Sequence, residues 1–254
     1  MYTAVATQNL SVGYPTRTVL REVNFTLKPG NMAVLIGANG SGKSTLLRTL
    51  AGVQPAIEGD IILDGQAIGT YSRRELARRL SVVFTDRTGG GALTVRECVE
   101  IGRHPYTGPL GRLNANDRQI VVDAIEAVGM TAKADRYMGT LSDGERQKAM
   151  IARALAQQTP FIILDEPTAF LDVAGRLDII RLLRRLADNG HAVLLSTHDI
   201  APAIATADTL LVVNGETLVA DSKDKIIASG ALDRAFPEAT LYFDAAKGDF
   251  VARI

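Results

Sequence analysis

Short apolar runs and amphipathic stretches alternate along the chain. Residues 2–10 and 19–27 alternate apolar and polar side chains, which is typical of half-buried strands. Apolar residues recur at helical spacing in later stretches, for example at 120–128 and 176–188. Continuous apolar runs predict buried strands at 32–36, 81–84, 161–164 and 192–196. Strands that alternate with helices predict an α/β fold with a mainly parallel sheet.

Two regions depart from this alternation. The strands near the N-terminus follow one another through glycine turns, which predicts an N-terminal antiparallel β subdomain. From 88 to 158 helical patterns follow a run of glycines, which predicts an inserted helical subdomain. We therefore expect a single domain over 1–254, in which 1–87 and 159–254 form the core. A terminal hairpin is predicted within 240–254.

Charge and composition narrow the classes of function. The chain has 28 Lys and Arg against 28 Asp and Glu, so bulk attraction to nucleic acid or to an anionic membrane is not expected. The single cysteine, Cys98, excludes an internal disulfide and a cysteine-based zinc site. The apolar runs are far shorter than the roughly 20 residues that cross a bilayer, and the first residues show no secretory signal pattern. We expect a soluble chain.

Arginines crowd two helical stretches, at 73–79 and at 181–185. A nucleic-acid site would want interleaved aromatic residues or a contiguous basic face. Glu75 instead stands four residues before Arg79, which is typical of pairing on a helix surface. Both stretches are therefore predicted to be solvated helix faces.

A phosphate-binding loop is predicted directly after the strand at 32–36. The sequence matches GxxxxGK[ST] and stands between an apolar strand and a helix. Glycines let backbone N–H groups converge on phosphate oxygens, and the helix N-terminus adds partial positive charge. Lys43 is predicted to bind the β- and γ-phosphates, and Ser44 to ligate Mg²⁺. The alternative, a turn that merely caps a helix, has no need of Lys43 followed by Ser44. The predicted nucleotide-binding residues are Gly37, Ala38, Asn39, Gly40, Ser41, Gly42, Lys43, Ser44 and Thr45.

Two carboxylates, Asp165 and Glu166, follow the apolar strand at 161–164. Open α/β sheets bind ligands at this end of their strands. Asp165 is predicted to hold Mg²⁺ through its hydration shell, and Glu166 to deprotonate a water that attacks the γ-phosphorus. The alternative is that the acidic pair caps the N-terminus of the next helix.

The run Leu141-Ser142-Asp143-Gly144-Glu145-Arg146-Gln147 resembles the LSGGQ signature of ABC-type ATPases. It precedes the Asp165-Glu166 pair at the distance found in that family. The resemblance implies that two copies sandwich ATP head to tail, with Ser142 and Gly144 of one copy at the γ-phosphate held by the other. Ser142 and Glu145 also have the S-x-x-E spacing of a helix capping box, and both roles can hold together.

Further positions match the family in the same order along the chain. Tyr14 is placed like the aromatic residue that stacks on adenine, and Asp172 resembles the D-loop aspartate that couples the two halves of the dimer. His198 resembles the switch histidine that contacts the γ-phosphate, so the resemblance implies that it is catalytic together with the glutamate described above. The alternative for Tyr14 is a structural turn residue, and His104 and His191 are interpreted as structural.

Two departures from the family pattern bear on the site. Asp143 replaces a glycine of the signature and Glu145 a glutamine, which adds negative charge where the γ-phosphate should bind, unless these carboxylates turn away into helix capping. The family also carries a metal-reaching glutamine after the strand at 81–84, and its position here is Thr85. Thr85 could reach the metal only through water, and Asp86 is the alternative ligand.

The stretch from Leu93 to Leu113 is similar to ATPases of importers for iron-siderophore complexes, haem and cobalamin, with its pattern TV-x-E followed by GR-x-PY. The resemblance implies ATP and Mg²⁺ as cofactors. The implied partners are a second copy of the chain, two membrane permease subunits and, indirectly, a solute-binding protein. It places the chain peripherally on the cytoplasmic face of a bacterial inner membrane. The alternatives are a DNA-repair or translation ATPase of the same superfamily, and a P-loop kinase or GTPase, which would leave the signature unexplained.

Overall fold

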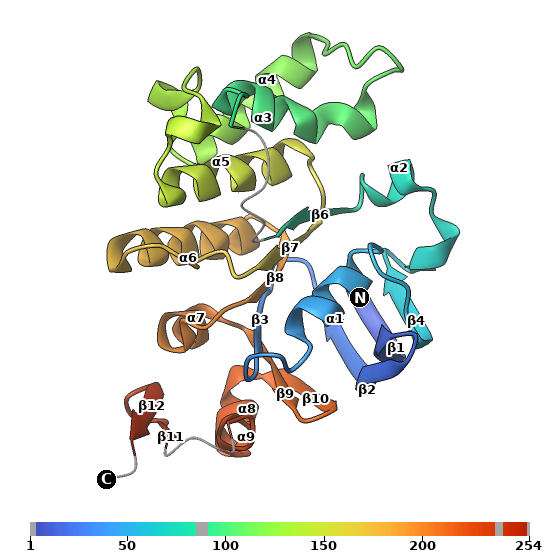
Figure 1. Ribbon diagram of the computed structural model, residues 1–254, viewed down its shortest axis with the longest axis vertical. Coiled ribbons are helices and arrows are strands. Elements are labelled where there is room, and N and C mark those ends of the chain that lie inside the picture. Colours follow the sequence, from blue (N-terminus) through green and yellow to red (C-terminus); the bar gives the residue numbers. More distant parts are fainter. Residues whose placement is uncertain (1–3, 85–90, 237–240, 253–254) are drawn as a thin grey trace.

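A central six-stranded sheet organises the molecule (Figure 1), of which the computed structural model describes residues 4–84, 91–236 and 241–252. Its strands are β3 (Met32–Ile36), β6 (Leu80–Val83), β7 (Phe161–Asp165), β8 (Ala192–Ser196), β9 (Thr209–Asn214) and β10 (Thr217–Ser222). They follow the spatial order β10-β9-β3-β8-β7-β6, and only the pair β9-β10 is antiparallel. Strands β3, β7 and β8 are buried at every position, as expected for parallel strands that are covered on both faces.

A second, antiparallel sheet lies beside the N-terminal half of the core. It contains β1 (Val5–Tyr14), β2 (Arg17–Leu27), β4 (Glu58–Leu63) and β5 (Gln66–Ala67) in the order β2-β1-β4-β5. Helix α1 (Lys43–Leu50) packs between the two sheets, since Leu46 and Leu47 share a buried cluster with Leu10 of β1 and Leu35 of β3. The predicted N-terminal antiparallel subdomain is confirmed.

A group of helices follows β6 in the chain and occupies the green and yellow upper part of Figure 1. It comprises α3 (Val95–Glu100), the short 3₁₀ helices η2 (Ile101–Tyr106), η3 (Thr131–Lys133) and η4 (Met138–Thr140), α4 (Ala115–Ala127) and α5 (Asp143–Ala156). Its buried residues, such as Val121 and Ile151, belong to one cluster with Val34 of the central sheet. The predicted fold class, a mainly parallel α/β core with an antiparallel sheet and a helical insertion, is therefore confirmed.

The remaining elements lie around the central sheet. They are η1 (Ile68–Thr70), α2 (Arg73–Leu76), α6 (Val173–Asp188), α7 (Ile200–Thr206), α8 (Lys223–Ala228), α9 (Ala231–Arg234), β11 (Leu241–Asp244) and β12 (Asp249–Ala252). The last two strands form the expected terminal hairpin, whose Phe243 and Phe250 meet edge to face with ring centroids 5.4 Å apart. Within the described residues, no helix is both long and apolar enough to span a membrane.

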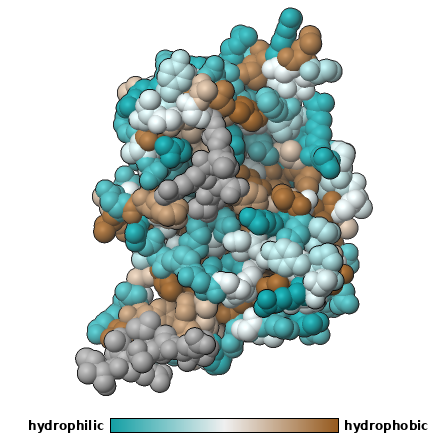
Figure 2. All heavy atoms as spheres, viewed as in Figure 1, coloured by the Kyte–Doolittle hydropathy of each residue, from teal (hydrophilic) through white to brown (hydrophobic). Residues whose placement is uncertain are grey.

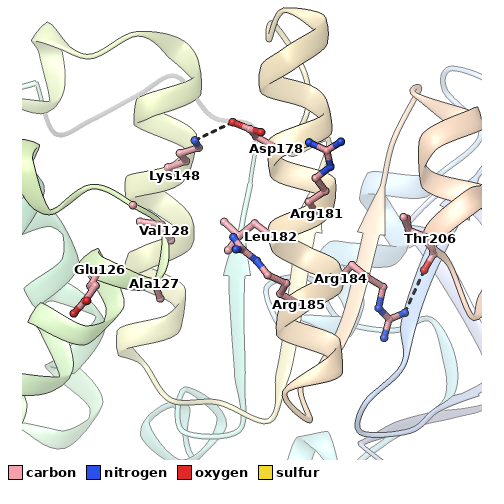
Figure 3. A pocket seen from close by; sticks show the side chains of 11 residues that line it. Glu126, Ala127, Val128, Lys148, Asp178, Arg181, Leu182, Arg184, Arg185 and Thr206 are labelled. Atoms are coloured by element: carbon pink, nitrogen blue, oxygen red, sulfur yellow. Dashed lines mark hydrogen bonds and ion pairs between the residues drawn. The ribbon is translucent and has the colours of Figure 1, made fainter.

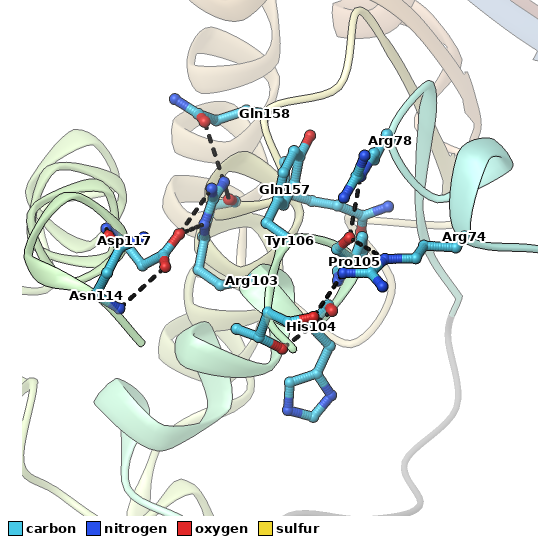
Figure 4. Close-up of polar contacts among 12 residues, drawn as sticks. Arg74, Arg78, Arg103, His104, Pro105, Tyr106, Asn114, Asp117, Gln157 and Gln158 are labelled. Atoms are coloured by element: carbon cyan, nitrogen blue, oxygen red, sulfur yellow. Dashed lines mark hydrogen bonds and ion pairs between the residues drawn. The ribbon is translucent and has the colours of Figure 1, made fainter. Parts of the chain in front are cut away.

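Arg74 and Arg78 of the 73–79 stretch are exposed, as predicted for a solvated face, and they also hydrogen-bond to the helical insertion (Figure 4). Arg74 Nε and Arg78 Nε donate to the carbonyl oxygen of Pro105 at 2.8 and 3.0 Å, and Arg74 Nη2 donates to that of Thr107 at 2.6 Å. The reason is tertiary: the carbonyls of η2 need donors, and α2 lies beside them. These arginines tie the core to the insertion.

A buried ion pair holds the insertion together (Figure 4). Arg103 and Asp117 have side chains only 4% and 5% exposed, and Arg103 Nη2 lies 2.9 Å from Asp117 Oδ1. Arg103 Nη1 also donates to the carbonyl of Ala156 at 2.8 Å and to Gln158 Oε1 at 3.0 Å. Every charged atom thus has a partner, which a buried ion requires.

Replacing Arg103 with alanine should destabilise the protein by about 3–5 kcal/mol, because it leaves the Asp117 carboxylate buried without its counter-ion. Urea unfolding measures this cost. Arg96→Ala is the matched control, since Arg96 pairs with Asp135 at the surface with side chains 40% and 81% exposed. Such an exposed pair contributes about 1 kcal/mol or less. Equal losses in the two variants would contradict the structural role given to Arg103.

Candidate functional site

The predicted phosphate loop connects β3 to the first turn of α1. Gly40 and Gly42 adopt φ values of 74° and 100°, a left-handed conformation that glycine adopts without strain. A Cβ at Gly42 would lie 2.4 Å from Val19 Cγ1, so the backbone runs too close to β2 for any other residue. The loop therefore brings bare backbone to the N-terminus of α1, which is the geometry that phosphate oxygens need.

Lys43 is the buried cation of this loop, with only 7% of its surface exposed. Its Nζ donates to the carbonyl oxygens of Gly37 at 2.7 Å and Ala38 at 3.1 Å. Burial lowers the pKa of Lys43, while the negative charges of Glu166 and Asp165 act in the opposite direction. The ammonium group of Lys43 is therefore within electrostatic range of both carboxylates that the sequence predicted.

Hydroxyl groups of the loop fit a bound phosphate. Among the described residues, Ser41 Oγ is one of two buried side-chain polar atoms without a hydrogen-bond partner. An unsatisfied buried hydroxyl is costly unless a ligand completes it. Ser44 stands one residue into α1 and is exposed, whereas Thr45 is buried. A nucleotide phosphate is the ligand chemistry that this loop fits.

Asp165 and Glu166 sit where β7 ends, beside the end of β8. Ser196 Oγ donates to Asp165 Oδ1 at 2.7 Å and accepts the backbone N–H of Glu166 at 3.0 Å. Glu166 has a φ of 52°, which is uncommon for a residue other than glycine and is typical of functional sites. Ser196 therefore fixes the Asp165 carboxylate and the backbone of Glu166, a role that the sequence did not reveal because it depends on the neighbouring strand.

The helix-capping alternative for these carboxylates is wrong. The next helix, α6, begins at Val173, and its N-cap is Asp172, whose Oδ1 accepts the backbone N–H of Gly175 at 2.7 Å. Asp165 and Glu166 therefore do not cap that helix. Another role must account for their position at the edge of the sheet, and the neighbouring His198 indicates that role.

His198 Nε2 lies 3.0 Å from Glu166 Oε1. Burial raises the pKa of the Glu166 carboxyl, while His198 and Lys43 draw it downward. A carboxylate with a raised pKa beside an imidazole, close to a phosphate loop, can accept a proton from a water molecule. His191, by contrast, places Nδ1 3.0 Å from the carbonyl of Thr159, which agrees with its structural interpretation.

The signature residues lie at the N-terminus of α5. Ser142 accepts the N–H of Glu145, and Glu145 accepts that of Ser142, so the capping box is confirmed. Glu145 also pairs with Lys133, whose hydrogen bond lowers the pKa of Glu145, and Asp143 Oδ1 lies 3.0 Å from Arg146 Nη1. Both added carboxylates thus have partners within the helical region, Glu145 in the capping box and Asp143 in an ion pair with Arg146.

Tyr14 ends β1 and is 50% exposed. It lines a cavity of about 810 Å³ together with Arg48, Ile57 and Phe84. Among the described residues that line this cavity, none belongs to the phosphate loop, so its shape alone does not assign it to a nucleotide base. Stacking of adenine on Tyr14 stays a prediction. Thr85 and Asp86, the predicted metal-site alternatives, lie outside the described residues.

A cavity of about 660 Å³ opens between α4, α5 and α6 (Figure 3). Of its charged lining residues, Lys148 pairs with Asp178 at 3.4 Å, and Arg184 pairs with Asp208, which lies outside the lining, at 2.7 Å. None of the predicted catalytic or phosphate-binding residues lines it. The edge of the central sheet is therefore the better candidate site.

A magnesium ion fits this site only in company with a nucleotide. The described residues contain no group of three or more His, Cys, Asp or Glu that could hold a metal. Mg²⁺ needs no such cluster, because it is usually bound by one or two protein oxygens, substrate phosphates and water. Ser44 and Asp165 offer oxygens of that kind at the phosphate loop and the end of β7.

Comparisons with known proteins agree with this geometry. A family model described as ABC transporter matches residues 20–169. The iron(3+)-hydroxamate import ATP-binding protein of Bacillus subtilis is 36% identical over 217 residues, covering 85% of this chain and 81% of that protein. The ferric enterobactin transport ATP-binding protein of Escherichia coli is 36% identical over 226 residues, covering 89% and 83%.

An archaeal relative and a solved structure extend the similarity. An uncharacterized ABC transporter ATP-binding protein of Methanocaldococcus jannaschii is 40% identical over 215 residues, covering 84% of this chain and 74% of that protein. The inward-facing conformation of a metal-chelate type ABC transporter has a TM-score of 0.83 at 27% identity, covering 98% of this chain and 95% of that chain.

Proposed function

Because the chain belongs to the ABC transporter family of ATPases, we propose that it is the ATP-binding and ATP-hydrolysing subunit of an importer for an iron complex, namely a ferric siderophore or haem, or for cobalamin. The observation that carries the proposal is the convergence of Lys43, Glu166 and His198 at one edge of the sheet. Siderophore complexes are the first choice, since the named relatives import iron(3+)-hydroxamate and ferric enterobactin.

The chemistry is hydrolysis of the γ-phosphate. The loop from Gly37 to Thr45 binds the phosphates, with Lys43 exchanging its carbonyl partners for phosphate oxygens. Mg²⁺, held by Ser44 and Asp165, would neutralise the charge of the phosphates. Glu166 accepts a proton from the attacking water, and His198 orients that carboxylate through its 3.0 Å contact.

The same proposal includes a second copy of the chain. Ser142 and Gly144 begin α5, whose N-terminus carries the partial positive charge that suits a phosphate of the opposite copy. Asp172 lies at the start of α6 and would contact the other half of the dimer. Residues 88–158 would act as one helical subdomain on a core of 1–87 and 159–254.

The remaining partners follow from the importer role. Two membrane permease subunits would bind the ATPase, which would lie peripherally on the cytoplasmic face of the membrane, and a solute-binding protein would act through them. The residues Gly102, Arg103 and Tyr106 of the pattern shared with iron-complex importers are occupied by packing and hydrogen bonds inside the helical region. Because their contacts are internal, they would not contact the solute.

Deleting the gene for this chain from its host should abolish uptake of a siderophore complex that carries labelled iron. A wild-type copy of the gene should restore this uptake. A copy carrying Glu166→Gln is the control, since it should fold but not restore transport. Parallel assays with haem and cobalamin assign the solute. Unchanged uptake of all three would exclude the importer and favour the alternative, an ATPase for DNA repair or translation, which sensitivity to DNA damage or to translation inhibitors would reveal.

A further inference from the structure

Arg176 connects two loops of the site with two different nitrogens. It lies in the first turn of α6, where Nε donates to the carbonyl oxygen of Leu171 at 2.8 Å. Its Nη1 donates to Asp199 Oδ1 at 2.6 Å. One loop follows Glu166 and the other contains His198, so a single guanidinium joins the segments that carry the proposed base and its histidine.

The Leu171 side of this bridge reaches the signature residues of the same chain. Leu171 is 6% exposed, and a Cβ at Gly144 would lie 3.7 Å from Leu171 Cδ2. The backbone N–H of Leu171 donates to the carbonyl of Thr168 at 3.3 Å. A shift of the first turn of α5 toward Leu171 would therefore press on this residue, whose carbonyl Arg176 holds.

Asp199 pairs with an arginine side chain and not with the helix that it precedes. Asp199 occupies the N-cap position of α7, where an aspartate normally accepts a backbone N–H of the first turn, yet its side chain makes no cap hydrogen bond. Its carboxylate pairs with Arg176 instead, and its side chain is 19% exposed. Its backbone N–H donates to Thr197 Oγ1 at 3.0 Å, and this hydroxyl lies 3.1 Å from Thr168 Oγ1.

We propose that Arg176 is a positioning residue, which passes movement of the signature turn from Leu171 to Asp199 and so sets the contact of His198 with Glu166. The proposal rests on the proposed function for the roles of these three segments. In the head-to-tail dimer proposed above, the signature of each copy contacts the ATP that the other copy holds. His198 of each copy contacts the ATP held by its own phosphate loop. Arg176 would therefore couple the two ATP sites.

The fork of the guanidinium matters for this role. Nε and Nη1 point in fixed, different directions, so they can satisfy a carbonyl and a carboxylate at once. A lysine ammonium is a point charge on a flexible stem, and it would reach one of these partners without holding the distance between them. Charge alone is thus not enough, which separates this role from ordinary surface pairing.

Arg176→Ala should lower kcat for ATP hydrolysis about 10- to 100-fold, the size of effect that misplaced catalytic groups produce. KM for ATP should change less than about twofold, since the phosphate loop is untouched. Cooperativity in ATP should fall toward a Hill coefficient of about 1, since the two sites lose their link. Arg176→Lys should stay close to the alanine variant. Arg181→Ala on the same helix, at an exposed position, is the matched control and should behave as wild type.

A double-mutant cycle tests the pairing itself. Asp199→Ala should lower kcat as Arg176→Ala does, and the double variant should lose no more than either single one. The proposal would be overturned if the losses of kcat in the two single variants multiplied in the double variant. Full rescue of kcat by Arg176→Lys, or cooperativity retained in Arg176→Ala, would also overturn it. A melting temperature lowered beyond that of Arg181→Ala, with kcat restored on cooling, would also overturn it, because the role would then be structural.

Hydrogen exchange separates this proposal from the proposed function. In the nucleotide-free full chain, Arg176→Ala should speed amide exchange in both 168–172 and 196–200, while Arg181→Ala should leave both segments unchanged. This readout needs no turnover. If wild type hydrolyses no ATP, the proposed function fails, and the exchange result still decides whether Arg176 holds the two loops. Unchanged exchange in Arg176→Ala would refute the positioning role even in an active ATPase.

Discussion

Replacing Glu166 with glutamine should lower kcat for ATP hydrolysis about 100- to 10,000-fold, the range that a lost general base produces. The amide keeps the shape of the side chain but cannot take a proton from water. ATP binding should persist, because the phosphate loop is unchanged. In the dimer proposed above, the unhydrolysed ATP should hold the two copies together. Steady-state ATPase assays, equilibrium ATP binding and size-exclusion chromatography with ATP measure these three effects.

The pH profile adds a second readout for Glu166. Burial raises the pKa of its carboxyl, and a base works only when it is deprotonated. Wild-type activity should therefore decline on acidification already above the pH at which an ordinary glutamate takes up a proton, and the residual activity of the glutamine variant should lack this limb. Glu126→Gln, an exposed glutamate of α4, is the matched control. Wild-type turnover in Glu166→Gln would remove the base from the mechanism.

Lys43→Ala should raise the Kd for ATP about 100-fold or more, because charge-assisted hydrogen bonds to phosphate are among the strongest single contacts in such sites. The loss also leaves the carbonyls of Gly37 and Ala38 without their donor. Titration with a fluorescent ATP analogue measures the change. Since burial lowers the pKa of Lys43, affinity in wild type should decline at a lower alkaline pH than for an ordinary lysine.

Lys148→Ala is the control for this experiment. Lys148 is the surface lysine of α5 that pairs with Asp178 at 3.4 Å, away from the phosphate loop. Its removal should leave ATP affinity unchanged. Undiminished affinity in Lys43→Ala would contradict the phosphate-loop assignment, whatever the activity of that variant.

The α/β core and the phosphate loop were predictable because their signals are local. Continuous apolar runs marked β3, β7 and β8, and the structure buries every residue of these strands. Boundaries were less predictable where tertiary contacts decide them. The sequence predicted a helical stretch at 73–79, but α2 spans only Arg73–Leu76, and β6 begins at Leu80, where it pairs with Phe161 of β7.

The partners of the two charged signature residues could not be identified from the sequence. The sequence predicted a conflict between Asp143, Glu145 and phosphate, together with its possible relief by capping. In the structure both carboxylates have other partners, which relieves this conflict. Glu145 caps the helix and pairs with Lys133, and Asp143 pairs with Arg146. Lys133 lies twelve residues before Glu145, and no local pattern marks it as the partner.

The sequence by itself predicted the chemistry that we propose for this protein: a contiguous loop from Gly37 to Thr45, and two carboxylates at the end of an apolar strand. Only the tertiary structure decided which groups position them. Ser196 reaches Asp165 across 31 residues of chain, and Arg176 reaches Asp199 across 23. The physical reason is that a chain with 28 positive and 28 negative side chains permits many pairings. Packing of the strands and helices selects one pairing, because hydrogen bonds and buried ion pairs act only over a few ångströms.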